Sequence, residues 1–271
     1  MEKIYSQVYT VRNYELGPYQ AAHVRTLLDY LGETADSHMR ELGVSIQDLL
    51  EKDLLWVLVG YRLKVSRYPQ AGEKVTVNTW YPGRQKRFYL RDFEVLDADG
   101  GPIAAATTSW ALIDAVKRRP VTNDKALPDL PVLDRRAIEE GIEHIPPADS
   151  PRRGDPFTVP SSCLDMYRHV NHVFYIQWAL DSVLPGIEKG VLPFSIEAVF
   201  KGETIAGDQL VVALQSTKKE GTWLHSIIRE CDDTELTRLR TKWGKDNWFL
   251  TRIGAQFEAS AGQPCRGTGS G

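Results

Sequence analysis

The densest group of polar side chains suited to acid–base chemistry lies in the second half of the chain. It runs Asp165-Met166-Tyr167-Arg168-His169-Val170-Asn171-His172 and contains two of the six histidines. A stretch with apolar residues at helical spacing overlaps its end and is predicted to be a helix that opens at His169-Val170. A helix N-terminus presents unpaired backbone N–H groups and about half a positive charge, which favour a carbonyl oxygen that gains negative charge.

Asp165 and His169 have the residue types for two roles at such a terminus. A carboxylate just before the helix can orient water or attack a carbonyl, and a histidine imidazole transfers protons near neutral pH. The spacing of these two residues fits a structural interpretation equally well, in which Asp165 is a capping or turn residue and His169 is a hydrogen-bonded structural histidine. Both readings stay open at this point.

Other common chemistries lack their signatures. The chain has no G-x-S-x-G elbow, no phosphate-binding loop, no G-x-G-x-x-G after a strand and no H-E-x-x-H, so we expect neither a cofactor nor a metal. Its three cysteines are odd in number and have no C-x-x-C spacing, which supports neither a disulfide framework nor a zinc cluster.

Composition describes an ordinary globular chain. With 271 residues, 42% hydrophobic, 25% charged and a net charge of −3, it does not have the basic surface of a nucleic-acid binder. No apolar stretch has the length of a membrane span, and the first residues lack the apolar run of a signal peptide. We therefore expect a cytoplasmic protein without a membrane partner.

Comparison of the chain with itself indicates a divergent duplication. Three pairs of segments match in order, at offsets of 146, 135 and 133 positions: His23-Val24 with His169-Val170, 71–77 with 206–212, and Trp110 with Trp243. Each copy reads as a short strand, one long helix and several antiparallel strands, and such a sheet buries the apolar face of the helix. The fold class predicted from this pattern is α+β, in two copies of one unit.

The copies differ in their carboxylates. At these offsets Tyr19 stands where Asp165 does, and Tyr68 stands where Glu203 does. Because the first copy keeps the histidine and the helix but neither carboxylate, any chemistry belongs to the second copy, and Glu203 joins the candidates. The predicted boundaries are 1–127 for the first unit, 128–156 for a proline-rich surface linker with room for one helical turn, 157–253 for the second unit, and 254–271 for a flexible tail.

A set of motifs along most of the chain resembles the acyl-acyl carrier protein thioesterases, which are built as tandem hotdog domains. The motifs of the first half are Leu55-Trp56-Val57-Leu58, Arg67-Tyr68-Pro69, Ala71-Gly72-Glu73, Thr79-Trp80, Arg91-Asp92, Ser109-Trp110 and Arg118-Arg119-Pro120. Those of the second half are Asp165 to Tyr175, similar to the family's D-x-N-x-H-V-N-N-x-x-Y segment, and Phe200-Lys201-Gly202-Glu203, similar to its Y-x-x-E strand. The resemblance implies two hotdog domains, each an antiparallel sheet wrapped on one long helix.

The same resemblance implies catalytic roles for Asp165, His169 and Glu203, with Tyr167 and Asn171 as accessory residues. Tyr167 stands where the family has a catalytic asparagine, and His172 replaces the second asparagine of its H-V-N-N run. A phenol is longer than an amide and has one donor, so the departure bears on any mechanism that depends on that asparagine. Tyrosine is found at this place in single-domain hotdog thioesterases that act on acyl-CoA, to whose segment this one is similar.

The implied reaction is hydrolysis of fatty acyl thioesters of acyl carrier protein. In the expected mechanism the carbonyl is polarised by the backbone N–H groups of His169 and Val170, and water attacks it. Glu203 or Asp165 is the general base, and His169 positions the water or protonates the leaving thiolate; a covalent anhydride on a carboxylate is the competing route. An acyl-CoA thioesterase and a non-catalytic acyl-binding protein remain the alternatives.

The first unit is expected to hold the acyl chain, with lining residues on its helix and in the run Leu54 to Leu58. Two basic clusters are expected to meet the acidic carrier protein or the phosphates of coenzyme A, or else to be solvated hairpin ends: Arg84, Lys86 and Arg87, and Lys117, Arg118 and Arg119. We expect a monomer or a homodimer.

Overall fold

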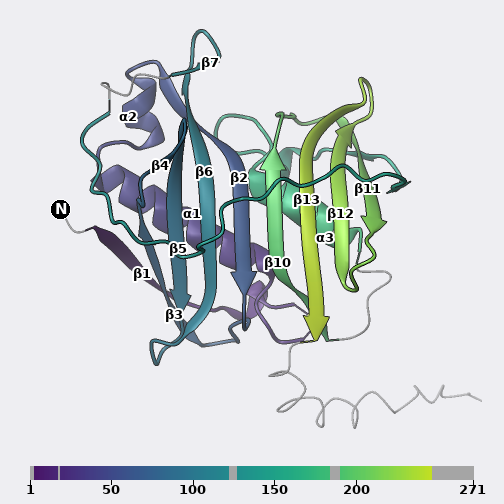
Figure 1. Ribbon diagram of the computed structural model, residues 1–271, viewed down its shortest axis with the longest axis horizontal. Coiled ribbons are helices and arrows are strands. Elements are labelled where there is room, and N and C mark those ends of the chain that lie inside the picture. The colour runs from purple at the N-terminus through teal and green to yellow at the C-terminus, as the bar shows by residue number, and fades with distance from the viewer. Residues whose placement is uncertain (1–2, 18, 122–126, 184–189, 246–271) are drawn as a thin grey trace, which may run out of the picture.

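The computed structural model describes residues 3–17, 19–121, 127–183 and 190–245. In this part of the chain, one antiparallel sheet carries both long helices on the same face (Figure 1). The predicted tail, 254–271, lies outside the described residues, as do positions 246–253 of the predicted second unit. Within the described residues, no helix has the length and apolar character needed to cross a bilayer.

The first unit contains one long helix, α1, and the strands that cover it. Its elements are β1 (Ile4–Thr10), the 3-10 turn η1 (Asn13–Glu15), α1 (Val24–Glu41), α2 (Ile46–Leu50), β2 (Leu54–Val65), β3 (Lys74–Trp80), β4 (Arg84–Gln85), β5 (Phe88–Leu96), β6 (Pro102–Asp114) and β7 (Arg119–Pro120).

The second unit has the same main order, in which strand, 3-10 turn and helix precede four antiparallel strands, around a shorter helix, α3. Its elements are β8 (Arg152–Arg153), β9 (Phe157–Thr158), the 3-10 turn η2 (Ser161–Cys163), α3 (His172–Asp181), β10 (Val191–Phe200), β11 (Gln209–Ser216), β12 (Thr222–Arg229) and β13 (Thr234–Lys245).

The two sheets are fused into one. The strand order is β1-β3-β5-β6-β2-β10-β13-β12-β11-β8. Equivalent strands of the two units therefore follow in opposite order on the two sides of the β2–β10 junction. The halves meet where β2 pairs with β10, with Leu63 opposite Ile196. The predicted α+β arrangement of two helix-and-sheet units is confirmed. The sequence did not predict the central pairing of β2 with β10. The run Leu54 to Leu58, predicted to line an acyl slot, is the start of the twelve-residue strand β2.

The main core lies between the helices and the sheet. Leu27 and Leu31 of α1 and Ile176 and Ala179 of α3 are at most 1% exposed. They belong to one continuous cluster that includes residues of both units. The two helices also touch, because the Arg25 guanidinium lies over the ring of Phe174, 4.5 Å from its centroid. This shared core fixes the start of α3 relative to the first unit.

The backbone corrects the register of the repeat around the helices to 148 positions. The Gly17 N–H donates to the Ala21 carbonyl as the Asp165 N–H donates to the His169 carbonyl, and the bonds on either side repeat in the same way. The equivalent pairs are Gly17 and Asp165, Tyr19 and Tyr167, Ala21 and His169, and His23 and Asn171. The offset of 146 was wrong because it aligned two His-Val pairs by identity, whereas hydrogen bonding determines structural equivalence.

The other two offsets agree with the structure. The indole N–H groups of Trp110 and Trp243, 133 positions apart, each donate to a threonine two residues earlier, at 2.8 and 2.9 Å. The carbonyls of Pro69 and Thr204, 135 positions apart, accept equivalent N–H groups. Tyr68 is therefore the counterpart of Glu203, and the first copy has no carboxylate at either candidate position.

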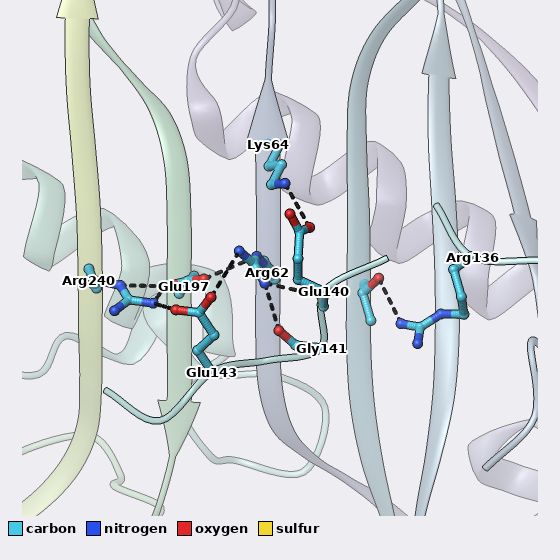
Figure 2. Close-up of polar contacts among 9 residues, drawn as sticks. Arg62, Lys64, Arg136, Glu140, Gly141, Glu143, Glu197 and Arg240 are labelled. Carbon is cyan, nitrogen blue, oxygen red and sulfur yellow. Dashed lines mark hydrogen bonds and ion pairs between the residues drawn. The ribbon is translucent and has the colours of Figure 1, made fainter. Parts of the chain in front are cut away.

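Residues 127–151, which we call the strap, cross the helix-free face of the sheet (Figure 1). The predicted helical turn is absent from the described residues of this segment, which bind the sheet by polar contacts instead. Arg62 donates to the carbonyls of Glu140 and Gly141 at 3.0 and 2.6 Å, and Arg240 donates to Glu143 at 2.5 Å (Figure 2). Both arginines also pair with Glu197 of β10, so the strap is tied to the junction of the two units.

Candidate active site

The Asp165 carboxylate closes the turn that precedes α3. Its Oδ1 accepts the backbone N–H groups of Tyr167 at 2.8 Å and His169 at 3.2 Å. Arg168, inside this turn, has a φ of 65°, a conformation uncommon for any residue with a Cβ. Asp165 thus holds the turn through one carboxylate oxygen, and within the described residues no hydrogen bond to Oδ2 is found.

The helix begins at His172 and not at His169 as predicted. Asn171 is its N-cap, and the side-chain oxygen accepts the Val173 N–H at 3.1 Å. The residues from Asp165 to His169, which precede this cap, are held in the turn that Asp165 closes and do not take helical geometry. Asn171 therefore has a structural role at the helix start.

The two N–H groups predicted to polarise the carbonyl already have acceptors in the protein. The His169 N–H donates to Asp165, and the Val170 N–H donates to the carbonyl of Thr204 at 3.0 Å. Thr204 is buried and directly follows Glu203. The Val170–Thr204 bond thus brings the segment after β10 against the turn before α3.

This contact places Glu203 beside His169. Oε2 of Glu203 lies 3.7 Å from Nε2 of His169 and 2.8 Å from the guanidinium of Arg118, which comes from the first unit. The His169 and Glu203 side chains are 34% and 40% exposed, so water reaches both. The structure thus brings together Asp165, His169 and Glu203, and no group of three or more His, Cys, Asp or Glu suited to a metal occurs in the described chain.

His172, the first residue of α3, lies among aromatic rings from both units. Its imidazole stacks on Tyr61 of β2 at 5.9 Å between centroids and meets Phe200 edge-on at 6.1 Å. Desolvation by these rings lowers the pKa of His172 to about 4, so the ring is neutral at physiological pH. Burial likewise raises the pKa of Tyr167, whose hydroxyl is enclosed without a hydrogen-bond partner.

The predicted basic clusters lie on two neighbouring hairpins of the first unit. Arg84, Lys86 and Arg87 are at the β4–β5 turn, and Lys117, Arg118 and Arg119 are at the β6–β7 turn. Antiparallel pairing of β5 with β6 places both turns at the same end of these two strands. Arg118 of this set contacts a candidate catalytic side chain, that of Glu203.

A small apolar cavity lies between the C-terminal end of α1 and the sheet of the first unit. Its lining residues are Met39, Leu42, Val44, Trp56, Tyr81, Tyr89, Leu90, Arg91, Trp110 and Leu130. Met39 and Leu42 come from the first helix and its end, and Trp56 comes from the run Leu54 to Leu58. The cavity therefore forms from the two segments predicted to line an acyl slot.

The contact of Arg118 with Glu203 and the contact of Tyr61 with His172 were both missed by sequence reasoning. The basic run Lys117 to Arg119 was visible in the sequence, but its contact with Glu203 depends on the pairing of β2 with β10. Tyr61 reaches His172 through the same pairing. His172 carried a signal as well, since it lies inside the polar group that drew attention to Asp165 and His169, whereas Tyr61 carried none.

Comparison with known proteins covers both units. Residues 2–127 match the family model of the acyl-ACP thioesterase N-terminal domain, and residues 149–245 match that of the C-terminal domain. A chloroplastic palmitoyl-acyl carrier protein thioesterase of Cuphea hookeriana is 27% identical over 96% of this chain and 66% of its own length. One of Arabidopsis thaliana is 30% identical over 89% and 64%. The chain thus spans about two thirds of the length of these curated relatives.

Solved structures share the fold. A crystal structure of an acyl-ACP thioesterase from Bacteroides thetaiotaomicron has a TM-score of 0.78 at 22% identity, covering 89% of this chain and 98% of that one. The 12:0-ACP thioesterase of Umbellularia californica has a TM-score of 0.79 at 21% identity, covering 90% and 98%. With both domain models matched in order, the chain belongs to the acyl-acyl carrier protein thioesterase family.

Proposed function

We propose that this protein hydrolyses the thioester between a fatty acyl chain and acyl carrier protein, releasing a free fatty acid and the carrier thiol. The observation that carries the proposal is the pairing of Glu203 with His169, 3.7 Å apart and open to water. Family membership supports the choice of a thioester, because the curated relatives are named as thioesterases of acyl carrier protein.

The Glu203–His169 pair supplies the proton chemistry in this mechanism. A water molecule beside the pair loses a proton to it as the oxygen attacks the thioester carbonyl, and the imidazole returns a proton to the thiolate that leaves. Asp165 holds His169 in position through the backbone N–H. The N–H groups of His169, Val170, Val173 and Phe174 already have acceptors in the protein. We therefore place the carbonyl oxygen at the His172 N–H, the first of α3, for which the described residues show no acceptor.

We propose that the acyl chain enters the first unit at this apolar cavity, whose volume of about 30 Å³ must increase by movement of the lining side chains before a fatty acyl chain fits. Its walls are mostly aromatic and aliphatic, including Met39, Trp56 and Trp110. Each methylene transferred from water to such a site is worth about 0.8 kcal/mol. The size of these side chains therefore sets the length of chain that the protein prefers.

We also propose that the carrier docks at the two basic hairpins. The turns at Lys86 and Lys117 lie at the same end of β5 and β6, as described above, and present cations to an acidic partner. Coenzyme A phosphates are the alternative ligand for the same cations. A direct comparison of carrier and coenzyme A thioesters therefore belongs in the first experiment.

That experiment measures thiol release from acyl carrier protein and acyl-CoA thioesters with chains of C8 to C18. We expect Glu203→Gln and Asp165→Asn to lower kcat by about 10²–10⁴-fold, the range for loss of general acid–base help. Glu230→Gln, which alters an exposed carboxylate outside the site, is the control and leaves kcat unchanged.

Activity of both site variants within a few-fold of wild type would contradict the assigned roles. If the wild type releases no thiol from any thioester but binds the acyl chain, the protein is a non-catalytic acyl-binding member of the fold. Faster release from coenzyme A than from carrier protein would favour an acyl-CoA thioesterase.

A further inference from the structure

The hairpin between β6 and β7 is built to hold Arg118 in one place. The Asp114 carboxylate accepts the N–H groups of Val116 and Lys117 at 3.1 and 2.7 Å, and the Arg118 N–H donates to the Asp114 carbonyl at 2.9 Å. Arg118 itself has a φ of 55°. Left-handed backbone at a residue with a Cβ is uncommon and tends to occur where a surrounding structure enforces it.

From this tip, Arg118 crosses to the second unit. Its guanidinium donates to Oε2 of Glu203 at 2.8 Å, and the same oxygen faces Nε2 of His169 at 3.7 Å. Within the described residues Arg118 is the one side chain, besides His169, that contacts the Glu203 carboxylate. The second unit thus contributes the acid–base pair, and the first unit contributes the cation that holds it.

We propose that Arg118 is a positioning residue for hydrolysis, which fixes the Glu203 carboxylate beside His169. This inference rests on the proposed function. The guanidinium keeps Oε2 in place by a charge-assisted hydrogen bond and limits rotation of the glutamate side chain. The role differs from carrier docking, because Arg118 then acts on every thioester, whatever group carries the acyl chain.

The exposure of the pair separates this role from a structural one. The Arg118 and Glu203 side chains are 60% and 40% exposed, and exposed ion pairs contribute little to folding. A second exposed pair, between Arg153 and Asp233 at 3.1 Å, provides a matched control. Loss of either arginine should leave the unfolding transition nearly unchanged.

The test compares hydrolysis by wild type, Arg118→Ala, Arg118→Lys and Arg153→Ala. One substrate is a fatty acyl thioester of acyl carrier protein, and the other is a small acyl thioester that has neither protein nor phosphate. We expect Arg118→Ala to lower kcat about 10–100-fold on both substrates, with KM for the small thioester within about twofold. Arg118→Lys, which restores the charge, should recover most of the loss, and Arg153→Ala should match wild type.

A double-mutant cycle sharpens the result. Arg118→Ala in a Glu203→Gln background should cost no further activity, because the arginine acts through that carboxylate. The inference is overturned if Arg118→Ala raises only KM for the carrier substrate, if it leaves both substrates unaffected, or if the two losses multiply. Absence of hydrolysis by wild type would instead overturn the proposed function, and the inference with it.

Discussion

Two histidines away from the His169–Glu203 pair, His38 and His225, are held neutral by burial. His38 on α1 is 2% exposed, and its Nδ1 accepts a hydrogen bond from Arg91 at 3.0 Å. Desolvation, with a smaller contribution from the Arg91 charge, lowers the pKa of His38 to about 4. His225 is fully buried beside Thr241, and desolvation lowers its pKa to about 3.

These two histidines predict an acid-sensitive fold. Each pKa is lower in the folded state than the ordinary value of 6.5, so the unfolded chain binds more protons below that pH and stability falls from about pH 6.5 toward pH 4. At pH 4 the loss from His38 is on the order of 3 kcal/mol. Urea unfolding at pH 7 and pH 5 should show a smaller difference in His38→Gln than in wild type; an equal difference would contradict the assignment.

At the scale of elements, the two long helices begin in different ways. The side chain of Asn171 caps α3 by accepting the Val173 N–H, whereas its counterpart His23 makes no capping bond at the start of α1. Replacement of Asn171 by alanine removes the acceptor for a helix N–H. The equivalent change at His23 removes none.

We therefore expect Asn171→Ala to lower the free energy of unfolding by about 1 kcal/mol, the usual value of an N-cap, and Asn171→Asp to preserve it. Urea unfolding at pH 7 measures both, and His23→Ala controls for the loss of a side chain at an equivalent position. A change in Asn171→Ala no larger than in Asn171→Asp would show that the capping bond is unimportant.

At the scale of the whole molecule, a buried ion network joins the two units and the strap. Glu197 of β10 is 1% exposed and pairs with Arg62 of β2 at 3.0 Å and with Arg240 of β13 at 2.5 Å (Figure 2). Close packing accompanies these charges: a Cβ on Gly60 would lie 2.6 Å from Cδ1 of Ile142 in the strap. The strap is therefore part of the folded core of the molecule.

Glu197→Gln leaves two largely buried arginines without their central carboxylate. We expect it to lower the free energy of unfolding by about 3–5 kcal/mol, since removal of one partner strands a buried charge. Lys64→Ala breaks the neighbouring exposed pair with Glu140, at 45% and 57% exposure, and should cost less than about 1 kcal/mol. Equal effects in chemical denaturation would contradict a special role for the buried network.

The helices, several strands and the candidate site could be predicted because short-range sequence patterns determine them. Spacing of apolar residues marks α1 and α3, β-branched and aromatic runs mark β3, β5 and β6 with their copies, and the polar group Asp165 to His172 marks the site. The start of α3 was misplaced by three residues, because composition does not show that Asp165 binds the backbone of Tyr167 and His169. The sequence also did not show whether an offset of 146 or of 148 positions relates the segments around the two helices.

Only tertiary structure decided which residues from the first unit reach the site. Pairing of β2 with β10 brings Arg118 to Glu203 and Tyr61 to His172, although 85 and 111 positions separate them in the chain. Residue types are properties of single positions, whereas distances between remote side chains follow from strand register and helix packing. The sequence alone therefore determined the candidate acid–base groups, and the fused sheet determined what holds them.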